Sequence, residues 1–302
     1  MSTGEVVLDV EGLRMRYGPV NVLHDVNFQA RQGEVLCLLG PNGAGKTTTV
    51  EILEGFRMRS AGRVEVLGTD PAGADERWRA RVGIVLQSWR DHGKWRVREL
   101  LEHLGRYYSA YSTETVERPW DADHLIAAVG LTPQAGHKIK TLSGGQRRRL
   151  DVAIGLVGRP ELVFLDEPTA GLDPIARRGF HELIAGLADA GETTVLLTTH
   201  DLAEAEKLAD RIMILDRGRI IADGTAAELA RQIAGEDEVR WERDGQSFRQ
   251  SAKDPTRFVF DLFKQYGEAI ENLEVRRATL EDTYLTLVRQ AETGGDTESE
   301  AR

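Results

Sequence analysis

A glycine-rich loop, set between a wholly apolar run and a helical stretch, constrains the fold of this chain more than any other feature. Residues 35–39 are continuously apolar, residues 40–47 read Gly-Pro-Asn-Gly-Ala-Gly-Lys-Thr, and residues 47–53 have helical character. In such a strand–loop–helix order, the glycines let backbone N–H groups approach phosphate oxygens, and the helix directs its positive end at them. An apolar run without alternation is typical of a central strand of a parallel sheet. The pattern therefore predicts an open α/β fold with a phosphate-binding loop at the carboxyl edge of its sheet.

Two further apolar runs end in polar residues that suit this edge of the sheet. Residues 162–165 lead into Asp166 and Glu167, and residues 194–197 lead toward His200. A carboxylate at a strand end can hold a divalent metal, directly or through water, whereas the competing interpretation of the acidic pair is a solvated strand end. We expect all three polar side chains to project from the carboxyl edge, beside the glycine loop.

The rest of the chain changes between strand and helix patterns. Residues 5–16 and 22–30 alternate apolar and polar side chains, which predicts strands of an antiparallel sheet with one solvated face. Residues 97–108 and 125–129 carry apolar side chains at helical spacing, and residues 202–212 form another helical run. Further expected elements are a hairpin closing the core at residues 212–215 and 219–222, a helix at Ala226–Ile233, a hairpin around residues 244–245, a helix at 256–266, a strand at 273–277 and a helix from Leu280.

Composition and charge limit the classes of function. A chain of 302 residues, 41% hydrophobic and 29% charged, is long enough for one sizeable domain and a small one. Its formal net charge of −10 argues against a broad electrostatic grip on nucleic acid, which needs clustered Lys and Arg. The single cysteine, Cys37, excludes disulfides within the chain and cysteine-based zinc or iron–sulfur sites, and it fits a reducing cytosol. The first five residues predict no secretory signal, and no apolar run approaches the ~18 residues needed to cross a bilayer.

A second candidate anion site lies between the glycine loop and the acidic pair. Residues 142–146 read Leu-Ser-Gly-Gly-Gln, and residues 146–156 have helical character. The start of such a helix offers another set of N–H groups and another positive helix end. We interpret the basic run at residues 147–149 as a helix face of solvated or ion-paired arginines rather than as a nucleic-acid patch.

These three motifs, in this order and at these spacings, resemble the ATP-binding cassette (ABC) ATPases, and the resemblance covers residues 5–225. It implies an α/β fold with a P-loop ABC ATPase core: a mixed parallel sheet with helices, an antiparallel β subdomain and an inserted helical subdomain, followed by a small C-terminal α/β extension. The expected domains are an ABC ATPase domain at residues 1–225, with its helical subdomain at about 88–158, and an accessory α/β domain at 226–290. Residues 291–302 are acidic without large apolar side chains, and we expect them to be a disordered tail.

The resemblance also implies ATP and Mg²⁺ as ligands and assigns roles to single residues. Glu167 is expected to polarise the attacking water, His200 to contact the γ-phosphate, and Gln87 to reach both metal and water as a third catalytic residue. Tyr17 matches the aromatic residue that stacks on adenine, although a tyrosine of the core is the competing interpretation. The implied metal ligands are Thr47, Gln87 and Asp166, and the implied nucleotide contacts are Tyr17, Gly40, Pro41, Asn42, Gly43, Ala44, Gly45, Lys46, Thr47, Thr48, Ser143, Gly144, Gly145, Gln146 and Asp173.

The family's mode of assembly gives the expected partners. In the family, two subunits pack head to tail, so that residues 143–146 of one copy cap the ATP of the other, and residues 171–173 match the loop that crosses this interface. The resemblance therefore implies a homodimer, or a pair with a paralogous cassette, formed on ATP binding. It also implies a transmembrane permease, contacted through residues 87–98, and no nucleic acid. Such a chain is expected in the cytoplasm, peripheral on the cytoplasmic face of the cell membrane.

The type of ABC protein is a finer prediction. Residues 141–174, together with residues 280–285 of the extension, look like the ATPase subunits of bacterial drug and polysaccharide exporters. This predicts that the chain powers a separate permease in the export of a drug-like or hydrophobic compound. An importer subunit and a soluble, non-transport ABC ATPase are the alternatives, and the presence of Glu167 and His200 disfavours a regulator without turnover.

Overall fold

The protein is described by a computed structural model for residues 4–85, 92–189, 193–233, 237–243, 245–276, 281 and 284. Its chain divides into two compact units, Met1–Ile221 and Ala222–Arg302. Strand β9 (Arg219–Gly224) spans the division. Within the described residues, no helix combines the length and the apolar character needed to cross a membrane.

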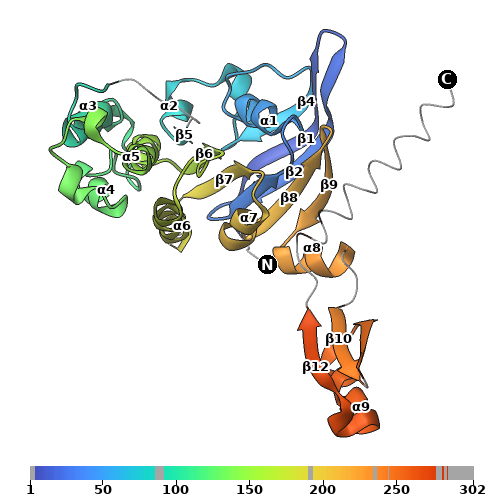
Figure 1. Ribbon diagram of the computed structural model, residues 1–302. Helices are drawn as coiled ribbons and strands as arrows, with labels where there is room; N and C mark the ends of the chain where they lie inside the picture. Colours follow the sequence, from blue (N-terminus) through green and yellow to red (C-terminus); the bar gives the residue numbers. More distant parts are fainter. Residues whose placement is uncertain are drawn as a thin grey trace. The chain divides into compact units, whose positions relative to one another are not determined.

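A six-stranded sheet forms the centre of the first unit, with the strand order β5-β6-β7-β3-β8-β9 (Figure 1). Strand β3 lies between β7 and β8 and is parallel to both, and all five of its side chains are buried. This confirms the prediction that the apolar runs are central parallel strands, because neighbours on both sides and packing on both faces leave no solvated side. The other strands are β5 (Val82–Val85), β6 (Leu162–Asp166), β7 (Thr194–Thr199) and β8 (Arg211–Asp216), and β3 is Val35–Leu39.

A second, antiparallel sheet has the strand order β2-β1-β4. Its long strands carry alternating apolar and polar side chains, as predicted, and their buried faces join the core of the central sheet. Leu13, Leu38 and Phe164, which come from β1, β3 and β6, belong to this shared core and are wholly buried. The strands are β1 (Val6–Tyr17), β2 (Val20–Arg31) and β4 (Ala61–Val66).

One helix of the core, α7, is shorter than predicted because tertiary hydrogen bonds end it. The predicted helical run at residues 202–212 is wrong beyond Leu208, where α7 ends. The reason is Asp210, whose carboxylate accepts a hydrogen bond from the N–H of Val35 at 2.8 Å and whose own N–H donates to the Val35 carbonyl at 2.9 Å. These two hydrogen bonds align the chain with β3, so that it continues as strand β8. The helices are α1 (Lys46–Leu53), α2 (Glu76–Arg79), α6 (Pro174–Asp189) and α7 (Leu202–Leu208).

Three further helices group at one end of the first unit and form the predicted helical region (Figure 1). The first of them ends at Gly105, so the prediction of helix up to residue 108 is wrong there. Tyr108 packs instead on Gly158, where a Cβ atom would come within 2.5 Å of the tyrosine ring. The helices are α3 (Val97–Gly105), α4 (Ala122–Ala128) and α5 (Gly144–Leu156).

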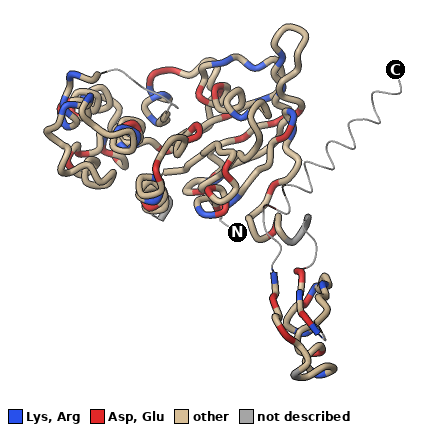
Figure 2. The backbone as a smooth tube through the Cα atoms, viewed as in Figure 1, with Lys and Arg blue, Asp and Glu red and all other residues tan. Residues whose placement is uncertain are grey.

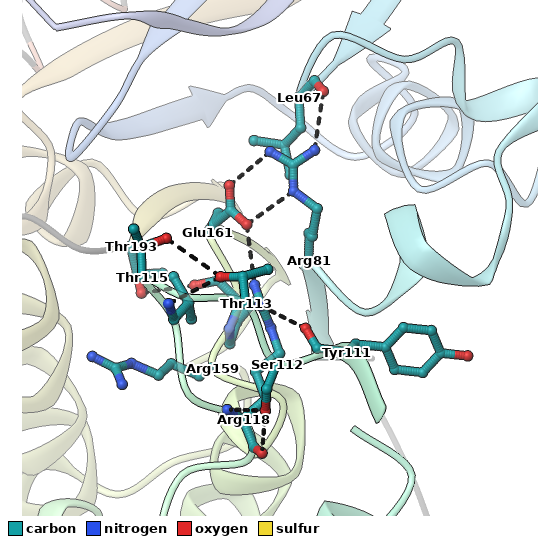
Figure 3. Close-up of polar contacts among 12 residues, drawn as sticks. Leu67, Arg81, Tyr111, Ser112, Thr113, Thr115, Arg118, Arg159, Glu161 and Thr193 are labelled. Atoms are coloured by element: carbon teal, nitrogen blue, oxygen red, sulfur yellow. Dashed lines mark hydrogen bonds and ion pairs between the residues drawn. The ribbon is translucent and has the colours of Figure 1, made fainter. Parts of the chain in front are cut away.

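An ion-pair network fastens the helical region to the central sheet (Figure 3). The Arg81 guanidinium donates to both carboxylate oxygens of Glu161, at 2.9 and 2.7 Å, and Arg118 donates to one of them at 3.0 Å. Arg118 is 4% exposed and also donates to the Tyr111 carbonyl at 3.2 Å. Burial raises the pKa of Glu161, but the hydrogen bonds and charges of Arg81 and Arg118 outweigh burial and leave this pKa below its usual value.

The second unit has a small core of its own. Three antiparallel strands in the order β11-β10-β12 pack with α9 around Trp241, Leu262 and their neighbours. The predicted helix, hairpin, second helix and strand are all present within a few residues, whereas the predicted helix from Leu280 and the acidic tail lie almost wholly outside the described residues. Figure 2 shows acidic and basic positions interspersed along the chain. The elements are α8 (Ala226–Ile233), β10 (Asp237–Arg243), β11 (Gln246–Ala252), α9 (Pro255–Tyr266) and β12 (Glu271–Arg276).

Candidate active site

The glycine loop joins the end of β3 to the start of α1. Gly45 caps the helix with a φ of 109°, and a Cβ there would come within 2.7 Å of the Leu23 side chain. A Cβ on Gly40 would come within 2.2 Å of the Leu215 carbonyl oxygen. Both positions therefore require glycine. No side chain caps α1, so the N–H groups of its first turn, from Lys46 to Thr48, keep their capacity for an anion.

The Lys46 ammonium lies across this loop. It is 5% exposed, and its Nζ donates to the carbonyls of Gly40 and Pro41, at 2.8 and 3.2 Å. Its third neighbour is the Glu167 carboxylate, whose Oε1 lies 3.4 Å from Nζ. A buried cation is thus held between the phosphate-binding loop, which follows β3, and an acidic residue that follows β6, two strands away in the sheet.

A hydroxyl of β7 positions the two acidic residues at the end of β6. Thr198 Oγ1 donates to Asp166 Oδ1 at 2.5 Å and accepts from the N–H of Glu167 at 3.0 Å. Asp166 Oδ2 in turn lies 3.2 Å from Thr47 Oγ1. The sequence analysis missed Thr198, although its place two residues before His200, at the end of a buried strand, was a signal for this contact.

The pair of Thr47 and Asp166 fits a magnesium ion. A hydroxyl and a carboxylate oxygen are the hard donors that Mg²⁺ prefers, and this ion usually takes few protein ligands together with phosphate oxygens. Within the described residues, no group of three or more His, Cys, Asp or Glu side chains is arranged to hold a metal, so a site made of protein ligands alone is not found there. Gln87, the third predicted ligand, lies outside the described residues.

Glu167 and His200 meet at the same edge. Glu167 has a φ of 42°, a left-handed conformation that costs energy for a residue with a side chain and is found most often at functional sites. Its Oε1 lies 3.3 Å from Nδ1 of His200. The structure therefore brings together Lys46, Thr47, Asp166, Glu167 and His200, from the ends of three neighbouring strands, as the sequence predicts.

The turn that carries His200 is fixed on both sides. The Thr199 hydroxyl donates to the carboxylate of Glu204 at 2.5 Å and accepts from the N–H of Asp201 at 3.0 Å. Asp201 caps α7 and forms an ion pair with Arg177 of α6 at 3.1 Å. Burial raises the pKa of Glu204, which is 2% exposed. His200 itself keeps a side-chain exposure of 56%, so it is anchored but accessible.

Tyr17 lies at the end of β1, 38% exposed. The guanidinium of Arg57 lies 5.0 Å from the centre of its ring, a cation–π contact, and Arg57 is paired with Glu51 of α1 at 2.6 Å. The hydrogen bond that Arg57 donates to the Glu51 carboxylate raises the pKa of Arg57. Arg57 and Glu51 therefore orient the tyrosine ring, and the sequence analysis missed both because no motif marks them.

The Leu-Ser-Gly-Gly-Gln motif lies at the start of α5, away from the glycine loop. Ser143 caps α5, accepting from the N–H of Gln146 at 3.2 Å, while the Gln146 side chain accepts from the N–H of Ser143 at 2.9 Å. Within the described part of the chain, no hydrogen bond or ion pair joins residues 143–146 to residues 40–47. Figure 1 shows α5 grouped with α3 and α4, apart from α1. The predicted second anion site is therefore a capped helix start that makes no contact with the glycine loop of the same chain.

The loop before α6 lies beside this motif. A Cβ on Gly145 would come within 2.8 Å of Ala176 and 3.9 Å of the Asp173 carboxylate. Asp173 caps α6 by accepting from the N–H groups of Ile175 and Ala176, both at 2.9 Å. The predicted interface residues Gly145 and Asp173 thus lie next to each other in one chain.

Arg148 corrects the interpretation of the basic run. It is 6% exposed, its Nε donates to the Pro168 carbonyl at 2.6 Å, and its Nη2 donates to the Asp166 carbonyl at 3.3 Å. Burial lowers the pKa of Arg148. Arg147 does form the expected ion pair, with Asp151 at 3.2 Å. Arg148 is therefore not solvated, and it ties α5 to the backbone on either side of Glu167.

Comparison with known proteins gives one consistent result. A family model described as ABC transporter matches residues 23–170. The Nod factor export ATP-binding protein I of Ralstonia nicotianae is 38% identical, over 93% of this chain and 93% of that protein. A daunorubicin resistance ATP-binding protein of Streptomyces coeruleorubidus is 40% identical, over 77% of this chain and 72% of that protein. A doxorubicin resistance ATP-binding protein of Mycobacterium tuberculosis is 39% identical, over 76% and 69%.

The solved structures agree with these relatives. A structure described as an ATP binding subunit of an ABC transporter aligns with a TM-score of 0.68 and 25% identity, and the alignment covers 93% of this chain and 99% of that one. An ATP-binding cassette of another ABC transporter, in its ADP conformation, aligns with a TM-score of 0.64 and shares the fold. With the strand-end cluster, these matches show that the chain belongs to the ATP-binding subunits of ABC transporters and is an ATPase.

Proposed function

We propose that the chain is the ATPase subunit of an exporter, powering a separate membrane permease that moves a drug-like or hydrophobic compound. The support comes from its relatives, which are named for Nod factor export and for resistance to daunorubicin and doxorubicin. A resistance protein that drives a drug out of the cell moves its compound in the same direction as an exporter does. We place the chain at the cytoplasmic face of the membrane, where it would contact the permease.

The observation that carries the proposed mechanism is the convergence of Lys46, Glu167 and His200, with both neighbours of the Glu167 carboxylate within 3.4 Å. On ATP binding, Lys46 exchanges its two loop carbonyls for phosphate oxygens, and the N–H groups of the loop and of the first turn of α1 hold the same phosphates. Glu167 then orients and deprotonates the attacking water, and His200 donates to the γ-phosphate.

The remaining ATP contacts follow from the same placement. Thr47 and Asp166 would hold Mg²⁺, with Gln87 as the predicted third ligand, and the bound ion would neutralise phosphate charge. Tyr17 offers a flat apolar face to adenine, in an orientation fixed by Arg57. Thr198 keeps Asp166 and Glu167 in place through its single hydroxyl.

The second nucleotide contact comes from a partner chain in this proposal. Residues 143–146 form a capped helix start that does not reach the P-loop of its own chain, and Gly145 lies beside Asp173. We place both on a head-to-tail interface with a second copy, or with a paralogous cassette. ATP then favours the closed pair because each nucleotide gains contacts from both chains.

The permease has a suitable groove to occupy. A groove of about 490 Å³ lies between the core and the helical region, with walls that include Trp78 and Ile84 on one side and Leu104 and Ile154 on the other. At its rim, Phe56 is 66% exposed and Tyr107 is 65% exposed. Such exposed aromatic side chains around an apolar groove mark an interaction site. Its helical wall includes Leu104 of α3, the helix that begins at Val97 within the segment that the sequence assigned to the permease.

Glu167→Gln tests the proposed mechanism. The variant keeps the shape of the side chain but loses the base, so we expect ATP binding within about threefold of wild type and a fall in turnover of at least about 100-fold. ATP-bound dimer should accumulate on a gel-filtration column. Glu182→Gln, which removes an exposed carboxylate of α6, is the control and should leave turnover unchanged. An unaltered ATPase rate in Glu167→Gln would overturn the assignment of the base.

A further inference from the structure

One acidic side chain lies in the groove between the core and the helical region, whose walls are mostly apolar. Glu54, directly after α1, lines the groove and is 7% exposed. Its backbone N–H is bonded to the Val50 carbonyl at 2.9 Å. Within the described residues, its carboxyl has no hydrogen bond and no ion pair. Burial of the residue removes much of the water around an unpartnered carboxyl, which is costly, and carboxyl groups perturbed in this way recur at functional sites.

The other charges near Glu54 do not compensate it. Burial, together with the negative charges of Asp166 and Glu51, raises the pKa of Glu54 to about 8. Arg79 of α2 is exposed at the groove and makes no ion pair with Glu54. Across the groove, the described lining residues of the helical region include only two titratable groups, Tyr107 and Tyr108. Among the residues that the structure describes, Glu54 is therefore an acid without a cation.

We propose that Glu54 receives a lysine or arginine side chain from the segment of the membrane permease that occupies this groove. The proposal rests on the proposed function, because it takes the permease as the occupant, and it adds the chemistry that selects the segment. Apolar walls bury the body of a helix, and the single carboxylate fixes its register by a charge-assisted bond. A segment without a basic residue at this point would leave the carboxyl buried and unpaired, so the wrong partner is rejected.

Association of the full chain with its permease measures this contact directly. The permease is the membrane protein that copurifies with the tagged wild-type chain, reconstituted in lipid nanodiscs and titrated with each variant without nucleotide. Glu54→Gln keeps the volume of the side chain and should weaken association at least about tenfold, and Glu54→Lys should weaken it further. Glu102→Gln, an exposed carboxylate of α3 that does not line the groove, is the matched control and should bind as wild type does.

A second readout separates a cation from a neutral hydrogen-bond partner. At pH 7 the free carboxyl of Glu54 keeps its proton, and a cation arriving beside it favours the ionised form. Assembly of the wild-type pair should therefore release about one proton, seen as a dependence of the calorimetric heat on the ionisation enthalpy of the buffer. Glu54→Gln should abolish this release. If Glu54→Gln binds more weakly but wild type releases no proton, the partner of Glu54 is not a cation.

Tyr107→Glu distinguishes failure of this inference from failure of the proposed docking. It places a charge at the exposed rim of the groove and should block any apolar occupant. If Tyr107→Glu weakens association and Glu54→Gln does not, the groove is the docking site and the cation contact is refuted. If neither variant weakens association, the groove does not receive the permease and both proposals about it fall, while the ATPase assignment stands.

Discussion

At the scale of the residue, position in the fold decides what a carboxyl group does. Glu167 and Glu54 are both acidic residues of the core, but Glu167 has Lys46 and His200 within 3.4 Å and Glu54 has no counter-charge in the described part of the chain. Sequence motifs marked the first and gave no sign of the second. The two carboxyl groups differ because, among the described residues, basic side chains from distant parts of the chain pair with Glu167 and not with Glu54, and no local sequence pattern encodes such contacts.

The uncompensated Glu54 makes stability depend on pH in a defined direction. Its pKa is about 8 in the fold and near 4.5 without the fold, so the unfolded chain loses the proton first as pH rises. This stabilising contribution is full below pH 4.5 and is lost as pH rises to 8, at about 1.4 kcal/mol per unit and at most roughly 5 kcal/mol in total.

Glu54→Gln removes this titration. Urea unfolding should show the variant within about 1 kcal/mol of wild type at pH 5 and more stable than wild type by several kcal/mol at pH 8.5. Glu182→Gln, at an exposed position of α6, serves as the control, and its stability relative to wild type should not change between pH 5 and pH 8.5. A difference between Glu54→Gln and wild type that stays constant across this range would contradict the buried, protonated carboxyl.

At the scale of the element, the sequence predicted what is locally encoded. The strands β3, β6 and β7 were predictable because they are wholly apolar and end in polar residues, and α5 was predictable from its cap. The end of α7 was not, because Asp210 leaves the helix to bond with Val35 of β3, 175 positions away. The burial of Arg148 was not predictable either, because its acceptors are carbonyls near residue 167. Tertiary hydrogen bonds therefore account for the main errors.

The attachment of the helical region is also a property of elements, and it depends on the Arg81–Glu161–Arg118 network (Figure 3). Glu161→Gln leaves the buried Arg118 guanidinium without its carboxylate, and we expect a loss of about 2–3 kcal/mol in the free energy of unfolding, which allows for the partial exposure of Glu161. Because the pKa of Glu161 is depressed, its contribution is present above pH 4.5 and is lost as pH falls below that value. Urea unfolding at pH 7.5 and pH 4 measures both.

The exposed pair of Arg178 and Glu182 provides the control for this element. Its side chains are 78% and 67% exposed, so Glu182→Gln should change the free energy of unfolding by less than about 0.5 kcal/mol. Hydrogen exchange should show that Glu161→Gln raises exchange in α3 and α4 more than in β3. Equal losses in the two variants would mean that the network does not fasten the helical region.

At the scale of the whole molecule, one chain carries two proposed half-sites that do not meet. The P-loop and the Ser143 motif lie on different parts of the first unit, and Arg148 links the second to the backbone beside Glu167. In the proposed head-to-tail pair, a shift of α5 at one interface would move the backbone beside Glu167, the proposed base, through Arg148. The sequence predicted this division through its resemblance to a known family, and the structure adds the link.

Complementation between two inactive variants tests the division. Lys46→Ala should lose phosphate binding, and Ser143→Arg should block the cap that the motif offers to a partner, so each variant alone should be inactive. In a mixed head-to-tail pair, one composite site carries both defects and the other carries neither. Mixing equal amounts should therefore restore ATPase activity to about a quarter of the wild-type rate if the sites act independently. A mixture as inactive as its components would mean that the two half-sites do not combine across chains.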